Sequence, residues 1–152
     1  AQVLLKLFTA PEKSLGVAGY ADEMAKPASP SGVSRTKPPL PDIGKRAPVT
    51  PDQLRDWLGT WRDPWFGDVR LCAVDGAVEW RSAKSPKMHG RIGELDGRYL
   101  LHWDDPSVDL DAFLAFSGSG ETRRLKMAKI DPDGDFSSDY EDLDFVRVGG
   151  CD

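Results

Sequence analysis

Residues 59–69, GTWRDPWFGDV, place three large aromatic side chains around an Asp-Pro pair. Asp63 and Pro64 suit the first two positions of a tight turn. Gly67 can take the left-handed backbone conformation in which few other residues are comfortable. The stretch therefore predicts the first hairpin of a β domain.

The three aromatic residues of this hairpin have different predicted roles. Trp61 precedes the turn, and we expect it to point inward as a plug. Trp65 and Phe66 lie on the turn itself, where rings have little reason to face water. They either fold back over the end of the domain as a lid, which we favour, or dock on another domain.

Outward from this hairpin, turn residues divide the chain into eight predicted strands. Asp75-Gly76 and Asp96-Gly97 are two-residue hairpin signals, and residues 131–134 (DPDG) form a turn by their proline and glycine chemistry. Eight hairpin-linked strands predict a mainly β, antiparallel up-and-down barrel, because closure removes exposed edges; a sandwich is the alternative. The predicted strands are 59–62, 68–74, 77–82, 88–95, 98–103, 112–117, 122–130 and 142–148.

The N-terminal third has a different composition. Residues 1–26 contain two short predicted helices and form the first region, and residues 27–49 form a linker, with six prolines between residues 27 and 48. Residues 50–150 form the predicted barrel domain. Its first element is a short helix with Thr50 as N-cap, Pro51 at the first position, Gln53 closing a capping box, and Gly59 at the end. A short helix followed by Gly-x-Trp on the first strand resembles the entry of lipocalin-type barrels.

The charge of the chain argues against several partners. The net charge is −5, and from Asp104 onward thirteen acidic residues face five basic ones. An acidic surface repels phosphate backbones, so we expect no nucleic-acid partner. Residues 3–8 are too short to span a bilayer, and no basic segment precedes them as in a signal peptide.

Metal and disulfide chemistry has few candidates. His89 and His102 have no partner at ligand spacing, so we expect no metal site. Residues 131–142 begin like a calcium loop but lack the glycine at the sixth position and the glutamate at the twelfth. Cys72 and Cys151 either form one bridge or remain two thiols, because sequence carries no distance.

One catalytic motif occurs and fails on its context. Ser34 and Lys37 satisfy the S-x-x-K pattern of serine β-lactamases, which needs both residues on one helix. Pro38 and Pro39 follow at once in the proline-rich linker, where a buried helix cannot form. The chain contains no asparagine, so the Tyr-x-Asn and Ser-Asp-Asn partners are impossible. We expect no catalytic residue and no cofactor in this chain.

Three separate blocks carry a family resemblance. LGTWRDPWFGDVRL, LHWDDPSVDLDAFLAFS and DFSSDYEDLDFVRV lie in this order between residues 58 and 148. Together they resemble the C-terminal domain of unknown function that follows the catalytic domain in many bacterial serine hydrolases of the class C β-lactamase type. The resemblance implies a lipocalin-like barrel. It also implies that residues 1–50 are the end of a hydrolase domain and its linker.

This resemblance sets the expected function. The family's catalytic Ser, Lys and Tyr belong to the preceding domain, so the chain is expected to be a noncatalytic accessory domain in assembly, domain packing or active-site access. The implied partners are that hydrolase domain and, in some relatives, further copies; an exported or periplasmic location is implied by the parent family. A stand-alone lipocalin-like small-molecule binder is the alternative. The candidate interface or barrel-end residues are Trp61, Arg62, Asp63, Trp65, Phe66, Asp68, Trp103, Asp104 and Asp105.

Overall fold

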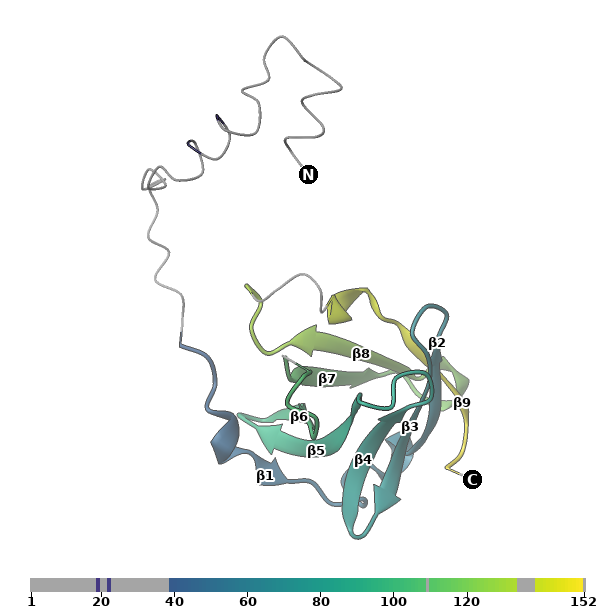
Figure 1. Cartoon of the computed structure of the whole chain (residues 1–152). Helices are drawn as coiled ribbons and strands as arrows, with labels where there is room; N and C mark the ends of the chain where they lie inside the picture. The colour runs from purple at the N-terminus through teal and green to yellow at the C-terminus, as the bar shows by residue number, and fades with distance from the viewer. Residues whose placement is uncertain (1–18, 20–21, 23–38, 109, 134–138, 152) are drawn as a thin grey trace. The chain divides into compact units, whose positions relative to one another are not determined.

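Eight antiparallel strands, β2 to β9, close on themselves to form a barrel (Figure 1). The computed structural model describes residues 19, 22, 39–108, 110–133 and 139–151. The strands are β2 (Gly59–Asp63), β3 (Gly67–Val74), β4 (Ala77–Ser82), β5 (His89–Leu95), β6 (Arg98–Trp103), β7 (Ala112–Ser117), β8 (Arg124–Lys129) and β9 (Phe145–Gly149).

The order of the strands confirms the predicted up-and-down barrel. Each strand pairs with the next in the sequence, and β9 returns to pair with β2. The two tight hairpins are also as predicted: Asp75 and Gly76 have φ of 50° and 79°, and Asp96 and Gly97 have φ of 52° and 73°. Two successive positive φ values define a turn whose twist matches that of the flanking strands.

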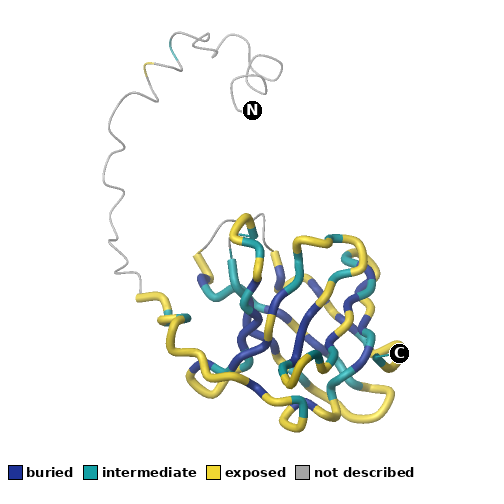
Figure 2. Tube along the Cα trace, turned by 60° about the horizontal axis from the view of Figure 1, so that its bottom comes forward, coloured by how far each residue is buried: buried dark blue, intermediate teal, exposed yellow. Residues whose placement is uncertain are grey.

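The interior of the barrel is filled by large side chains. Trp61, Trp80 and Phe145 are fully buried, and the ring of Trp80 meets Phe145 edge-on at 5.4 Å between centroids. Along β2 and the first half of β3, buried positions alternate with less buried ones, and Figure 2 colours the chain by burial. Trp61 therefore points inward, as predicted. Its ring stacks on Trp57, and its indole N–H donates to the Trp57 carbonyl at 3.0 Å.

The helix predicted from Thr50 to Gly59 does not form, and that expectation was wrong. Residues 51–54 are turns, and only the 3-10 helix η3 (Arg55–Trp57) follows them. Most of the backbone bonds here join residues three apart. Half of the capping box is present, since the Thr50 N–H donates to the Gln53 side chain at 2.7 Å. So few residues give too little helix to offset the cost of nucleation.

A short arm precedes the barrel and packs on its outer face. The 3-10 helix η2 (Ile43–Lys45) is followed by β1 (Ala47–Pro48). This strand pairs with residues 93–94 of β5, next to residues 89–91, which pair with β4. A second apolar cluster lies on this outer face, made of Leu95, Leu100 and Phe113, with Ile43 and Ile130 packed against it. The structure thus adds residues 39–49 of the predicted linker to the compact unit that begins at Pro39. The rest of that linker and nearly all of the predicted helical segment 1–26 lie outside the described residues.

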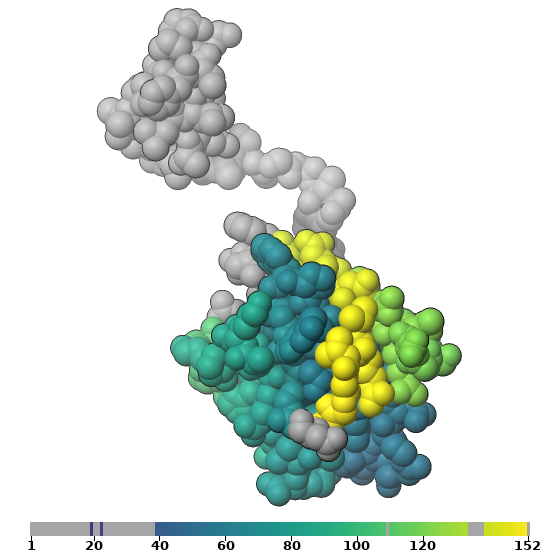
Figure 3. Space-filling view, turned by 90° about the vertical axis from the view of Figure 1, so that its right-hand side faces the viewer, coloured from purple at the N-terminus to yellow at the C-terminus, as the bar shows by residue number. Residues whose placement is uncertain are grey.

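A disulfide and hydrogen bonds hold the C-terminal end of the chain beside β2 and β3. Cys72 and Cys151 form a disulfide with their Cα atoms 5.8 Å apart, which decides between the two possibilities left open by the sequence. The Arg70 guanidinium donates to the Cys151 carbonyl, and the Thr60 hydroxyl donates to the Gly150 carbonyl at 2.8 Å. Figure 3 shows this yellow segment lying beside the blue strands.

Candidate docking surface at one end of the barrel

The up-and-down topology gathers several loops at one end of the barrel. The even-numbered strands all end there, and the odd-numbered strands from β3 onward begin there. The loops at this end are therefore 64–66, 83–88, 104–111 and 130–144, of which residues 109 and 134–138 are not described. Most of the candidate residues expected at an interface or barrel end lie in or next to these loops.

Asp63 joins the first hairpin to the loop before the last strand. Its side chain is only 4% exposed. One carboxylate oxygen, Oδ1, accepts from the backbone N–H groups of Trp65 and Phe66, both at 2.8 Å. The other, Oδ2, accepts from the N–H of Asp144 at 2.9 Å. A single carboxylate therefore closes the hairpin and also holds it against a segment about eighty residues later.

The same contacts set the charge state of Asp63. Burial is the largest single influence and raises the pKa of the Asp63 carboxyl. The three backbone N–H donors, helped by the charge of Lys126, lower the pKa by more than burial raises it. The pKa therefore lies below its ordinary value, and the group is a carboxylate at neutral pH.

Arg62 and Asp68 form a forked ion pair on the outer side of the same hairpin. The two residues are directly opposite each other on β2 and β3. Their two N–O distances are 2.5 and 2.8 Å. The hydrogen bond from Arg62 holds the pKa of Asp68 below its ordinary value. Both side chains are partly exposed, so the pair supports the hairpin's register more than its stability.

Trp65 and Phe66 have different surroundings, and only Phe66 packs on the core as the expected lid. Phe66 packs against the core and meets the ring of Phe145 edge-on at 5.7 Å. Trp65 is 91% exposed, and the lid prediction is wrong for it. The Asp63 carboxylate accepts from the N–H groups of both residues, so hydrogen bonds hold the turn in which one ring packs on the core and the other faces water. Tryptophan is enriched among the residues that anchor protein interfaces, so this exposed ring on an ordered hairpin is a candidate anchor.

A groove of about 510 Å³ runs beside Trp65. Its walls are the hairpin tip and the segment that leads into β9, which includes the 3-10 helix η6 (Tyr140–Asp142). Leu143, which lines the groove, and the nearby Tyr140 are both buried in the barrel core, so this segment is held in place by packing. The lining residues are Asp63, Pro64, Trp65, Asp139, Asp142, Leu143 and Asp144.

The remaining candidate residues do not line this groove. Trp103 is buried, and its indole N–H donates to the Leu110 carbonyl at 2.8 Å. Asp104 pairs with His89 at 3.0 Å. Asp105 lies 3.9 Å from Lys87, and a hydrogen bond from Ser107 holds its pKa below the ordinary value. Trp61 is fully buried and contributes packing rather than surface.

The sequence reasoning missed the second wall of the groove. In the sequence, Asp139, Asp142 and Asp144 stand out only through the acidic excess, the calcium-like loop and the third family block, and none was expected at an interface. The signal was available, because closure of an up-and-down barrel must bring the loop before the last strand next to the first hairpin.

The other chemistry-bearing side chains are engaged elsewhere. The ring Nδ1 of His102 lies 2.8 Å from an Asp111 carboxylate oxygen, whose other oxygen accepts from the Trp103 backbone N–H at 3.2 Å. In the start of the calcium-like loop, Asp131 accepts from the backbone N–H of Asp133 at 3.1 Å, and Asp135 is outside the described residues. Over the described part of the chain, no group of three or more His, Cys, Asp or Glu residues could hold a metal ion. Within that same part, no helix has the length and apolarity needed to cross a membrane.

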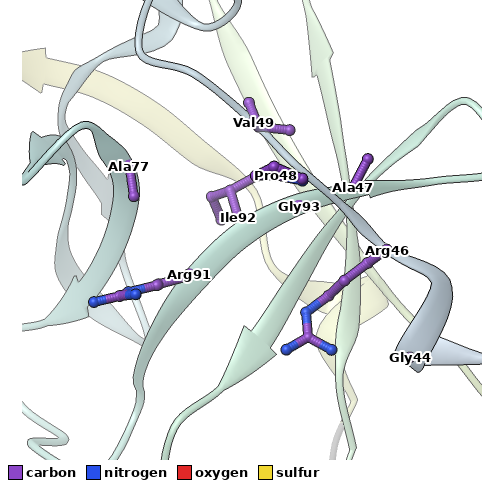
Figure 4. A pocket seen from close by; sticks show the side chains of 9 residues that line it. All are labelled: Gly44, Arg46, Ala47, Pro48, Val49, Ala77, Arg91, Ile92 and Gly93. Atoms are coloured by element: carbon purple, nitrogen blue, oxygen red, sulfur yellow. The ribbon is translucent and has the colours of Figure 1, made fainter.

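A second hollow, of about 360 Å³, lies where β1 and β4 both meet β5 (Figure 4). Arg46 and Arg91 stand on either side of it and extend in different directions. The Arg46 guanidinium donates to the Ile43 carbonyl at 2.9 Å, and Arg91 lies 3.8 Å from the Glu79 carboxylate. Because both cations have partners within the domain, this hollow presents no converging charges to a ligand.

One known family matches nearly the whole barrel domain. Residues 45–147 match the domain of unknown function DUF3471. The match covers most of the chain, so the protein belongs to the DUF3471 family. Searches of curated proteins and of solved structures found no match.

Proposed function

We propose that this chain is the noncatalytic accessory domain of a serine hydrolase of the class C β-lactamase type and docks on the hydrolase domain through the Trp65 groove. The observation that carries the proposal is Trp65 itself, 91% exposed at the tip of a hairpin that Asp63 holds in place. Large exposed aromatic side chains beside a hollow are the usual anchors of protein interfaces.

Three further features support this function. The three sequence blocks that resemble the hydrolase-associated domain lie between residues 58 and 148, and their described residues include both walls of the groove. The barrel interior holds large, fully buried side chains such as Trp61 and Trp80, which favours a structural role for the interior over ligand binding. The disulfide between Cys72 and Cys151 supports an oxidising compartment, in keeping with an exported parent protein.

The coding sequence upstream of Ala1 tests this proposal. We expect it to encode a helix with S-x-x-K and a later Tyr-x-Asn. The longer protein should then hydrolyse an ester, an amide or a β-lactam, while residues 1–152 alone should not. An upstream sequence without these motifs contradicts the proposal, and so does hydrolysis by residues 1–152 that a Ser34→Ala variant abolishes.

A further inference from the structure

Trp65 differs from two other aromatic residues of this domain in having no cation over its ring. The Arg98 guanidinium lies 3.5 Å from the ring centroid of Phe113, and that of Arg123 lies 5.5 Å from the ring of Trp57. No such contact to Trp65 exists within the described ranges, and its ring is the most exposed of the large apolar side chains there. An indole face attracts cations more strongly than any other side-chain ring.

The groove beside this ring is negatively charged. Four of its lining residues are aspartates, and none is basic. Asp139 lies 3.4 Å from Lys129, and Asp144 lies 3.4 Å from Lys126, so nearby lysines partly balance these two. The Asp142 carboxylate has no ion pair with any of the described residues. A cation that enters the groove would therefore find both a free carboxylate and a free aromatic face.

The two walls are held in a fixed relation before anything binds. Asp63 bonds to the backbone of Trp65 on one wall and of Asp144 on the other. Leu143, between Asp142 and Asp144, is buried in the core. Binding to such a surface requires little ordering of the protein, which favours affinity even for a small contact.

From these features we infer that the Trp65 groove binds an arginine side chain presented by a partner protein. The planar guanidinium stacks on the Trp65 indole and donates to the Asp142 carboxylate, while the aliphatic stem of the arginine packs on Pro64 and Leu143. Arginine fits better than lysine because a flat, weakly hydrated guanidinium can stack and form hydrogen bonds at once. This inference rests on the proposed function in one respect, namely that the partner is the hydrolase domain.

Titration of the full 152-residue chain with acetyl-Gly-Arg-Gly-amide tests the inference. The readout is the indole N–H resonance of Trp65, assigned by its loss in a Trp65→Phe variant. We expect a saturable shift of this resonance with the arginine peptide, and binding at least about threefold weaker with the uncharged citrulline peptide and with the lysine peptide.

Two matched variants locate the charge. Asp142→Asn should weaken binding of the arginine peptide by about threefold or more, because it removes a charge-assisted hydrogen bond. Asp75→Asn removes the same charge at the other end of β3, and it should leave the affinity unchanged. No shift at Trp65, equal binding of the citrulline or lysine peptide, or equal losses in the two variants would overturn the inference.

Failure of this inference can be told apart from failure of the proposed function. If the upstream sequence encodes the hydrolase but the peptides do not bind at Trp65, the arginine chemistry is wrong and the accessory role is untouched. If the arginine peptide binds as expected but no hydrolase lies upstream, the groove retains its chemistry and the assigned partner is wrong.

Discussion

Asp63→Ala is expected to destabilise the barrel by about 3 kcal/mol at pH 7, as measured by urea unfolding. The Asp63 carboxylate accepts three backbone hydrogen bonds, from Trp65, Phe66 and Asp144. A hydrogen bond to a charged group contributes about 1.5–3 kcal/mol, and we use the lower value. The Asp144 bond counts once, and the two hairpin bonds together count as one, because the N–H groups of the exposed hairpin tip can bond to water instead.

Asp63→Asn tests the roles of the two carboxylate oxygens separately. It should lower the free energy of unfolding by about half as much as Asp63→Ala, roughly 1.5 kcal/mol. The amide oxygen can still accept from the hairpin N–H groups. The amide nitrogen cannot accept from Asp144, so the tie to the loop before β9 is lost. Asp104→Ala is the control, because its ion pair with His89 is on the surface and such pairs contribute at most about 1 kcal/mol.

The effect of Asp63 should depend on pH in a stated direction. The pKa of the folded-state carboxyl is lowered, so its stabilisation is fully present above the unfolded-state pKa, near 3.9, and is lost as the pH falls through the folded-state value. The stability difference between the wild type and Asp63→Asn should therefore shrink as the pH falls below about 4. A wild type and Asp63→Ala variant that differ by less than about 0.5 kcal/mol at pH 7 would refute the reasoning, as would a difference that does not shrink on acidification.

Three other outcomes are expected. Trp61→Ala should cost about 3–5 kcal/mol in urea unfolding because it empties a fully buried site, whereas Trp65→Ala should stay within about 1 kcal/mol of the wild type; equal losses would contradict the burial of one and the exposure of the other. Replacing Cys72 and Cys151 by serine should cost about 4.5 kcal/mol in the loop-closure estimate for a separation of 79 residues, and an unchanged urea midpoint would count against it. Limited proteolysis should leave a stable fragment that begins near Pro39, and a fragment that begins after β1 would show that the arm does not hold.

The barrel could be predicted because its signals are local. Asp75-Gly76 and Asp96-Gly97 fix two hairpins through backbone conformations that few other residue pairs adopt as readily. Alternation places Val69 and Leu71 on one face of β3, and both are buried. Such short-range rules are enough to count strands, and a count of eight consecutive strands favours closure.

The arm around β1 could not be predicted by the same rules. A strand of two residues that includes Pro48 has no alternation to detect, and it pairs with residues more than forty positions later. The arm that contains this strand places Ile43 against the outer apolar cluster at Leu100 and Phe113. The adjacent pair Leu100 and Leu101 was the available sign, since neighbouring strand residues face opposite sides and both are buried.

One wall of the candidate site could be read from a local pattern, and the other could be inferred only from closure of the barrel. The hairpin 59–69 drew attention because of its aromatic residues and its turn chemistry, and Asp63 and Trp65 both line the groove. The partner wall is about eighty residues away along the chain, and only the pairing of β9 with β2 brings it there. Trp65 and Phe66 are neighbours in one turn, and no sequence pattern shows which ring packs on the core: Phe66 does, and Trp65 is 91% exposed.

The Trp65 indole resonance gives the most direct test of docking. The isotope-labelled 152-residue chain should be mixed with the separately expressed upstream domain, and the indole N–H signals followed. We expect the Trp65 signal to shift or broaden while those of the buried Trp61 and Trp80 stay in place. The change should need a higher concentration of the upstream domain with Asp142→Asn but not with Asp75→Asn. An unchanged Trp65 signal in the presence of a folded, active upstream domain would contradict docking through this groove.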